Sequence, residues 1–256
     1  GSVVVYQDEV YKDYLKFTFV SGGTWTYYNG QGFDIEYSVN DGSWQASEIG
    51  AEHTTTVSVS SGDTIRVRGT NATYNPLGLG GNEETKGRFG GTSYYNLSGN
   101  IIALFGGVNY ESVTALTTVQ TFAEIFKKSN IISAGNLMIP SSVTMTGECY
   151  AGLFSGCASL TTVPTLPSSN YAGACYEDMF AGCTSLASVP VNYLPATTLT
   201  DYCYAKMFYN CTSLTQAPEL PATTLADTCY YFMFAGCSSL TTAPVLPATT
   251  LPQSCY

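Results

Sequence analysis

The residues in this chain whose type and spacing could do chemistry are nine cysteines. They recur in two columns, with a step of 8 residues inside each repeat and of 18 or 20 residues to the next repeat. The first column holds Cys149, Cys175, Cys203, Cys229 and Cys255, and the second holds Cys157, Cys183, Cys211 and Cys237. Cysteines in such columns can form disulfides, bind a metal ion or pack as small buried groups.

Buried free thiols are the use that we favour for these columns. Nine is an odd number, so the cysteines cannot all pair within one chain. Thr121 and Ser129 take the two column positions in the stretch before the repeats, which indicates sites for small side chains. A disulfide ladder in an oxidising compartment stays open as the alternative. We expect no metal site, because C-x-x-C spacing is absent and the chain has a single histidine, His53.

Catalytic motifs are absent from the sequence. Neither G-x-S-x-G nor H-E-x-x-H occurs. Asp34, Glu36 and Asp41 are close enough in sequence to raise the question of a glycosidase pair or a weak calcium site. We favour a solvated strand face, because Arg66 and Arg68 also share one face of a strand and could pair with these acids. The chain is therefore expected not to be an enzyme and to use no cofactor.

The cysteines belong to a longer repeat, and its elements must position any site. Cys-Tyr-x-x-Met-Phe-x-x-Cys places apolar residues at i, i+1, i+4, i+5 and i+8, which predicts one or two helical turns. Ser-Leu-Thr-x-Val/Ala-Pro predicts a short strand ended by proline, and Leu-Pro-Ala-Thr-Thr-Leu turns the chain back. A single unit cannot bury its apolar face, so the units must stack. Residues 149–256 hold the cysteine repeats, and residues 107–148 are expected to form a degenerate capping region.

This repeat resembles the leucine-rich repeats of the BspA-like surface proteins of gut Bacteroidetes, on the elements M-F-x-G-C-x-S-L, P-x-L-P-A-T-T-L and C-Y. The resemblance covers residues 121–256 in four consecutive copies. It implies a right-handed solenoid of short strands and short helical turns. It also implies an extracellular location at the bacterial surface and adhesion to host matrix, other cells or glycans.

Residues 1–106 contain no cysteine, and their sequence pattern differs from that of the repeats and indicates a separate domain. Short alternating segments such as Tyr14–Val20 and Phe33–Val39 predict strands, and Asn40-Asp41-Gly42 predicts a hairpin turn. The segment Gly69–Gly91 is expected to form a long loop. The predicted fold class is therefore mixed and has two domains, an N-terminal β-sandwich (1–106) followed by the leucine-rich-repeat solenoid (107–256). A small β domain before the repeats also resembles the same surface-protein group.

Composition restricts the possible partners. The formal net charge is -10, with 9 Lys+Arg against 19 Asp+Glu, so no basic footprint for nucleic acid is present. No apolar run approaches the roughly 18 residues that span a membrane. The chain opens with Gly1-Ser2-Val3 and without a signal peptide, so we expect an export signal outside the sequence given.

Threonine and tyrosine are the best candidates for ligand contact. Tyrosine is frequent, with 20 residues, and gives large contact area at low entropic cost. The predicted ligand-binding residues are Thr161, Thr162, Thr215, Gln216, Thr241, Thr242, Tyr193, Tyr209 and Tyr231. From these residues we predict a surface protein that recognises a protein or glycan through the solenoid face. The alternatives are a carbohydrate-capture module of a nutrient-uptake system and a passive surface spacer. End-to-end self-association through the last coil is a further expectation.

Overall fold

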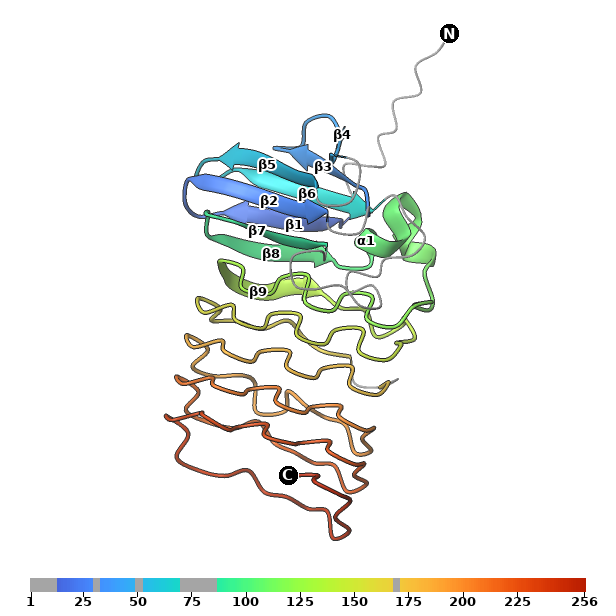
Figure 1. Ribbon diagram of the computed structural model, residues 1–256, viewed down its shortest axis with the longest axis vertical. Helices are drawn as coiled ribbons and strands as arrows, with labels where there is room; N and C mark the ends of the chain where they lie inside the picture. Colours follow the sequence, from blue (N-terminus) through green and yellow to red (C-terminus); the bar gives the residue numbers. More distant parts are fainter. Residues whose placement is uncertain (1–12, 30–32, 49–52, 70–86, 168–170) are drawn as a thin grey trace.

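The computed structural model describes residues 13–29, 33–48, 53–69, 87–167 and 171–256. Two β-sheets lie at one end of an elongated molecule, and irregular coils stack below them to the C-terminus (Figure 1). The first sheet has six strands in the order β4 (Gln45–Ala46), β3 (Ile35–Val39), β6 (Thr64–Gly69), β1 (Leu15–Phe19), β8 (Tyr95–Asn100) and β9 (Ile131–Met138). The second has the order β5 (His53–Val59), β2 (Gly23–Asn29) and β7 (Arg88–Gly91). A short helix, α1 (Ala103–Gly106), and a 3-10 helix at Gly107–Ser112 lead toward the coils.

The two sheets share one aromatic core. Strand β1 alternates buried and half-buried residues, as the period of a strand with one inward face requires. Phe17 of β1 contacts Trp25 of β2 and Phe89 of β7, with ring centroids 5.6 and 5.1 Å apart. Asn40 and Asp41 adopt positive φ and join β3 to β4, which pair antiparallel.

The predicted fold class, a β-sandwich followed by a leucine-rich-repeat solenoid with helical turns, is wrong. In the described residues the regular structure is two sheets with one short α-helix, and no α-helix or strand lies after Met138. The repeats contribute only isolated bridges to strand pairing, such as Ser133 with Thr162 and Thr198 with Thr224. The segments predicted as helical turns and short strands are instead irregular coils.

Each predicted helical turn is a run of four-residue turns, which we call a turn run. In the repeat that begins near Cys149, positive φ recurs at Glu148, Gly152 and Gly156. An α-helix requires negative φ throughout, so these residues break it at every fourth position. The apolar spacing i, i+4, i+8 fits a four-residue turn as well as a helix. The prediction of helical turns was wrong for this reason.

Backbone hydrogen bonds of the turn runs alternate between two directions. The amide of Leu153 bonds the carbonyl of Tyr150 in the same coil at 3.2 Å. The amide of the next residue, Phe154, bonds the carbonyl of Met179 in the following coil at 2.9 Å. A helix would satisfy every amide within its own segment. Here every second amide is satisfied only by a neighbouring coil, so one coil cannot keep this conformation alone.

Aromatic side chains also stack from one coil to the next inside the molecule. A phenylalanine column runs through Phe126, Phe154, Phe180, Phe208 and Phe234, with ring centroids 5.7–5.8 Å apart and nearly parallel planes. A second column holds Phe122, Tyr150, Tyr176, Tyr204, Tyr230 and Tyr256 at 5.6–6.1 Å. Offset stacking of this kind adds to the free energy of burial.

Strand β7 closes the upper end of the stack. The amide of Phe89 bonds the carbonyl of Ile125 at 2.8 Å, and the Phe89 ring stacks on Phe126 at 5.7 Å. The hydroxyl of Ser129 donates to the carbonyl of Phe89 at 2.5 Å. Phe89 thus takes the place that a phenylalanine of a preceding coil would have.

The sheet also crosses the predicted domain boundary. β9 belongs to the predicted capping region 107–148, yet it pairs in parallel with β8 of the first part of the chain. The division at residues 106 and 107 stays a prediction.

Removing one ring from the phenylalanine column tests the stack. Phe180 is fully buried between Phe154 and Phe208, so Phe180→Ala should lower the free energy of unfolding by about 3–5 kcal/mol. Chemical denaturation measures this change. Ser188→Ala, at an exposed position of the same coil, should change it by less than about 0.5 kcal/mol. Equal effects of the two substitutions would contradict the stacked arrangement.

The junction at Ser129 gives a second test. Ser129→Ala leaves the buried carbonyl of Phe89 without its donor and should cost about 1–3 kcal/mol in the free energy of unfolding. Ser129→Cys should be tolerated better, since Cys157 donates its S–H to the carbonyl of Phe126 at the equivalent place one coil further on. Denaturation curves that rank the two variants in the opposite order would show that the junction is held by other contacts.

Candidate functional site

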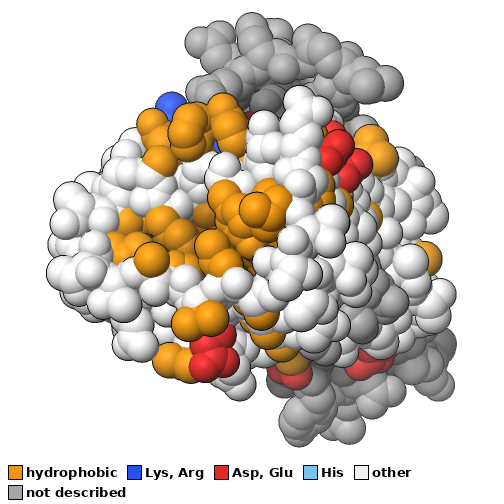
Figure 2. Space-filling view, turned by 90° about the horizontal axis from the view of Figure 1, so that it is seen from below, with side chains coloured by type: hydrophobic (Ala, Val, Ile, Leu, Met, Phe, Trp, Pro, Cys, Tyr) orange, Lys and Arg blue, Asp and Glu red, His pale blue; other side chains and the backbone are white. Residues whose placement is uncertain are grey.

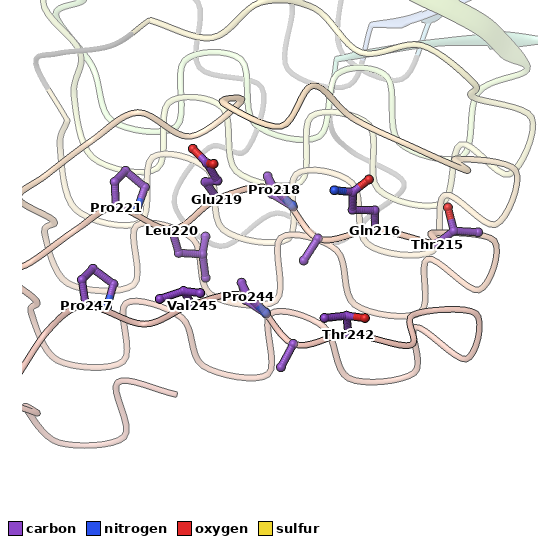
Figure 3. Close-up of a pocket in the computed structure, with 12 residues that line it drawn as sticks. Thr215, Gln216, Pro218, Glu219, Leu220, Pro221, Thr242, Pro244, Val245 and Pro247 are labelled. Atoms are coloured by element: carbon purple, nitrogen blue, oxygen red, sulfur yellow. The ribbon is translucent and has the colours of Figure 1, made fainter.

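Prolines open a groove along one side of the coil stack. The segment from Thr215 to Pro221 lies beside the segment from Thr242 to Pro247 of the next coil, and both are fully described. Proline has no amide hydrogen to donate, so each proline removes one possible backbone hydrogen bond between neighbouring coils. No backbone hydrogen bond connects these two segments to each other. Their separation leaves a hollow of about 630 Å³, which we call the proline groove (Figure 3).

The walls of the proline groove are apolar and its edges are polar. Pro218 lies over Pro244 and Pro221 over Pro247 (Figure 3). Val245 adds aliphatic surface between these pairs and is 84% exposed, whereas Leu220 and Pro218 line the groove but are buried. The remaining lining residues are Thr215, Gln216, Ala217, Glu219, Thr242 and Ala243.

Hydrogen bonds to the preceding coil position the polar edge of the proline groove. The hydroxyl of Thr215 donates to the carbonyl of Ala187 at 3.2 Å, and the amide of Glu219 bonds the carbonyl of Val191 at 2.7 Å. Gln216 and Thr242 are exposed. The groove therefore offers an amide, hydroxyls and one carboxylate beside an apolar surface.

A second groove of about 970 Å³ lies nearer the sheets. Its lining includes Asn100, Asn136 and Asn192 together with five prolines, and none of the described residues that line it is charged. Tyr193 also lines it, but its ring is buried and its hydroxyl donates to the carbonyl of Pro164 at 2.8 Å.

The structure distributes the nine predicted contact residues over several places. Thr215, Gln216 and Thr242 line the proline groove. Thr161, Thr162 and Thr241 are exposed outside that lining; the hydroxyl of Thr161 bonds the carbonyl of Ile132 and that of Thr162 bonds Ser133. Tyr193 lies inside the stack, whereas Tyr209 and Tyr231 lie on the turn runs. The groove prolines and Glu219 were missed, although the recurring P-x-L-P element was their signal.

The turn runs carry an aromatic patch of their own. Tyr202, Tyr209 and Phe232 are exposed, and the rings of Tyr231 and Phe232 lie 4.2 Å apart. Lys206 lies between Tyr202 and Tyr209 in the same turn run and is the one basic residue after Cys149. This patch is separate from the proline groove, so one flat ligand surface does not contain all the predicted tyrosines and threonines.

The last coil leaves apolar side chains uncovered. Seen from the C-terminal end, hydrophobic side chains gather over the centre of the stack (Figure 2). Val245, Leu246, Leu251 and Tyr256 are all exposed. End-to-end self-association through this coil stays a prediction.

Glu36 and Asp41 are paired with arginine, and Asp34 accepts a hydrogen bond from Asn29 at 3.2 Å. Glu36 accepts a hydrogen bond from Arg68 at 2.7 Å, and Asp41 lies 2.8 Å from Arg66. The Arg68 guanidinium also lies 4.1 Å from the ring centroid of Trp44. Among the described residues no group of three His, Cys, Asp or Glu could hold a metal ion.

All nine cysteines are free and buried. Burial disfavours the charged thiolate and raises the pKa of Cys157 from 9.0 to about 12. The same cause raises the pKa of Cys149 to about 12 and that of Cys229 to about 11. Thiols of this kind are weak nucleophiles near neutral pH.

Comparison with known proteins gives no relative. No family model, no curated protein and no solved structure matches the chain. Among the described residues no helix is long and apolar enough to cross a membrane. The resemblance to BspA-like surface proteins therefore stays a prediction.

The buried thiols predict how stability changes in alkali. An unfolded thiol loses its proton near its ordinary pKa of 9.0, while the folded Cys157 thiol keeps its proton up to about 12. The unfolded state then binds fewer protons, so the free energy of unfolding should fall as pH rises between these values. Denaturant titrations at a series of pH values measure this slope. Cys157→Ala should show a shallower slope than the parent chain, and an identical slope would contradict the assigned burial.

Proposed function

We propose that this chain is a binding protein that holds an extended, uncharged segment of a protein or glycan in the proline groove. The observation that carries the proposal is the hollow of about 630 Å³ between two neighbouring coils. It joins three of the predicted contact residues, Thr215, Gln216 and Thr242, in one place.

The chemistry of the groove supports this choice of ligand. Binding sites combine apolar walls with a few polar groups that fix orientation, and the groove has both. The proline rings give rigid apolar surface that loses little entropy on binding. The Gln216 amide can donate and accept hydrogen bonds, as the hydroxyls of a sugar or the backbone of an extended peptide require.

The low charge of the proline groove supports an uncharged ligand. Glu219 is the only charged residue in the groove lining. A surface with so little charge attracts its ligand by shape and hydrogen bonding, with little electrostatic steering. Binding should accordingly depend weakly on salt.

The cellular setting is part of the proposal and rests on the repeat resemblance. That resemblance implies the bacterial surface, where the ligand would be a host or cell-surface molecule. Carbohydrate capture for nutrient uptake would use the same groove chemistry with a different role for the bound glycan. A passive spacer would need no ligand in the groove.

Substitution in the groove tests the proposal. A panel of immobilised neutral glycans and extracellular-matrix proteins first selects a binder. Gln216→Ala with Thr242→Ala should then raise the dissociation constant by about tenfold or more, equivalent to about 1.4 kcal/mol, because both residues contribute polar contacts. Titration by biolayer interferometry measures the change.

Two controls define the site. Thr223→Ala alters an exposed threonine outside the groove lining and should leave the dissociation constant unchanged. Tyr209→Ser alters the aromatic patch of the turn runs. If Tyr209→Ser weakens binding and the groove variant does not, the ligand lies on the turn runs and the proposed site is wrong. No binding to any member of the panel would favour the spacer.

A further inference from the structure

The two cysteine columns differ in what their sulfur atoms contact. In the second column each thiol donates to the carbonyl of a phenylalanine in the preceding coil. These S–H bonds join Cys157 to Phe126, Cys183 to Phe154, Cys211 to Phe180 and Cys237 to Phe208, at 3.0, 3.3, 3.1 and 3.0 Å. Each thiol in this column thereby donates to a backbone carbonyl.

The first column contains one close pair of sulfur atoms. The Sγ atoms of Cys175 and Cys203 lie 3.7 Å apart, and both residues are fully buried. The Sγ of Cys229 instead points to the carbonyl of Cys255 at 3.8 Å. Cys149 has Thr121 as its column neighbour in the preceding coil and Cys175 in the following coil, but among the described residues the only S–H···S contact joins Cys175 to Cys203. The pair at 175 and 203 is thus distinguished from the rest of the array.

The backbone around this pair suits a covalent link. The amide of Tyr176 bonds the carbonyl of Cys203 at 3.2 Å, so the two cysteines lie on directly neighbouring coils. The rings of Tyr176 and Tyr204, which follow the two cysteines in the same coils, have their centroids 6.0 Å apart. A spacing of this size between neighbouring coils falls within the range of about 4.4–6.8 Å between Cα atoms that a disulfide allows. Rotation of the two side chains can bring the sulfurs from 3.7 Å to about 2 Å.

We propose that Cys175 and Cys203 form a disulfide when the chain meets an oxidising small-molecule disulfide such as oxidised glutathione. One thiolate attacks the glutathione disulfide and releases a first glutathione thiol. The second cysteine then attacks the mixed disulfide, forms the Sγ–Sγ bond and releases a second glutathione thiol. The two protein thiols are oxidised, their two protons pass to the released thiolates, and one glutathione disulfide is reduced to two thiols.

The bond would join two coils of the stack. It closes a loop of 28 residues in sequence separation that includes Tyr193 and two of the five prolines of the second groove, Pro190 and Pro195. A closed loop lowers the entropy of the unfolded chain, so the oxidised protein should unfold at a higher denaturant concentration. Tyr171 packs edge-on against both Tyr176 and Tyr204, at 6.0 and 6.1 Å, and shields this part of the core.

The burial of Cys175 and Cys203 determines how disulfide formation must be measured. Burial raises the pKa of the Cys175 thiol well above its ordinary value, so exchange in the folded state should be slow. The chain is therefore treated in two ways with the same mixture of oxidised and reduced glutathione. One sample is folded from the start, and the other is unfolded in denaturant under reducing conditions and then refolded in the mixture.

Peptide mapping by mass spectrometry after alkylation identifies the bonds. We expect the refolded sample to contain one predominant cross-link, between Cys175 and Cys203, with the other seven cysteines alkylated. Its denaturation midpoint should fall when a reducing agent is added. Seven or more alkylated thiols without that cross-link, or cross-links spread over both columns, would overturn the proposal.

Two matched variants test whether the cross-link requires Cys203. Cys203→Ala should abolish the cross-link and the shift of the midpoint on reduction. Cys211→Ala removes a thiol of the second column from the same coil and should leave both in place. Circular dichroism checks that each variant is folded. If Cys203→Ala does not fold, the wild-type cross-link map still decides the proposal.

Discussion

Every second backbone amide of a turn run depends on the next coil for its hydrogen bond. The amides of Tyr150 and Phe154 find their acceptors at Cys175 and Met179, one repeat away. Buried amides without acceptors are costly, so a single coil in this conformation would be unstable. Stacking is therefore a requirement of the backbone before any side chain contributes. The phenylalanine and tyrosine columns then follow from the same spacing, because equivalent residues of successive coils lie directly over one another.

The same requirement explains the junction with the sheets. The first turn run needs a neighbour on its upper side, and strand β7 supplies one with a backbone contact and an aromatic ring at Phe89. Ser129 completes the contact where the repeats have cysteine. A strand can serve here because it presents backbone groups along an edge, as a coil does. Sheets and coils consequently share one continuous apolar core.

The grooves arise where this ladder is interrupted. Prolines at the P-x-L-P elements cannot donate, so fewer backbone hydrogen bonds join neighbouring coils there, and hollows with apolar walls lie beside them. The proposed binding function and the proposed disulfide both depend on this division of each coil. Its turn run is hydrogen-bonded to the neighbouring coils and sets the spacing of the cysteines, and its proline segment lines a groove.

The sequence by itself determined the repeat, its length and the identity of the buried columns. Cys149, Tyr150, Leu153 and Phe154 are all buried, as the spacing of apolar residues indicated, because burial depends mainly on which residues recur. Thr215 and Thr242 are exposed, and their role as contact residues stays a prediction. The tertiary structure decided the backbone conformation, since a four-residue apolar period fits a helix and a turn run equally. It also decided which predicted contact residues share a site: Tyr193 is buried, and Tyr209 and Tyr231 lie on the turn runs away from the groove lining. Those outcomes depend on hydrogen bonds between residues about 26 positions apart, which no local pattern specifies.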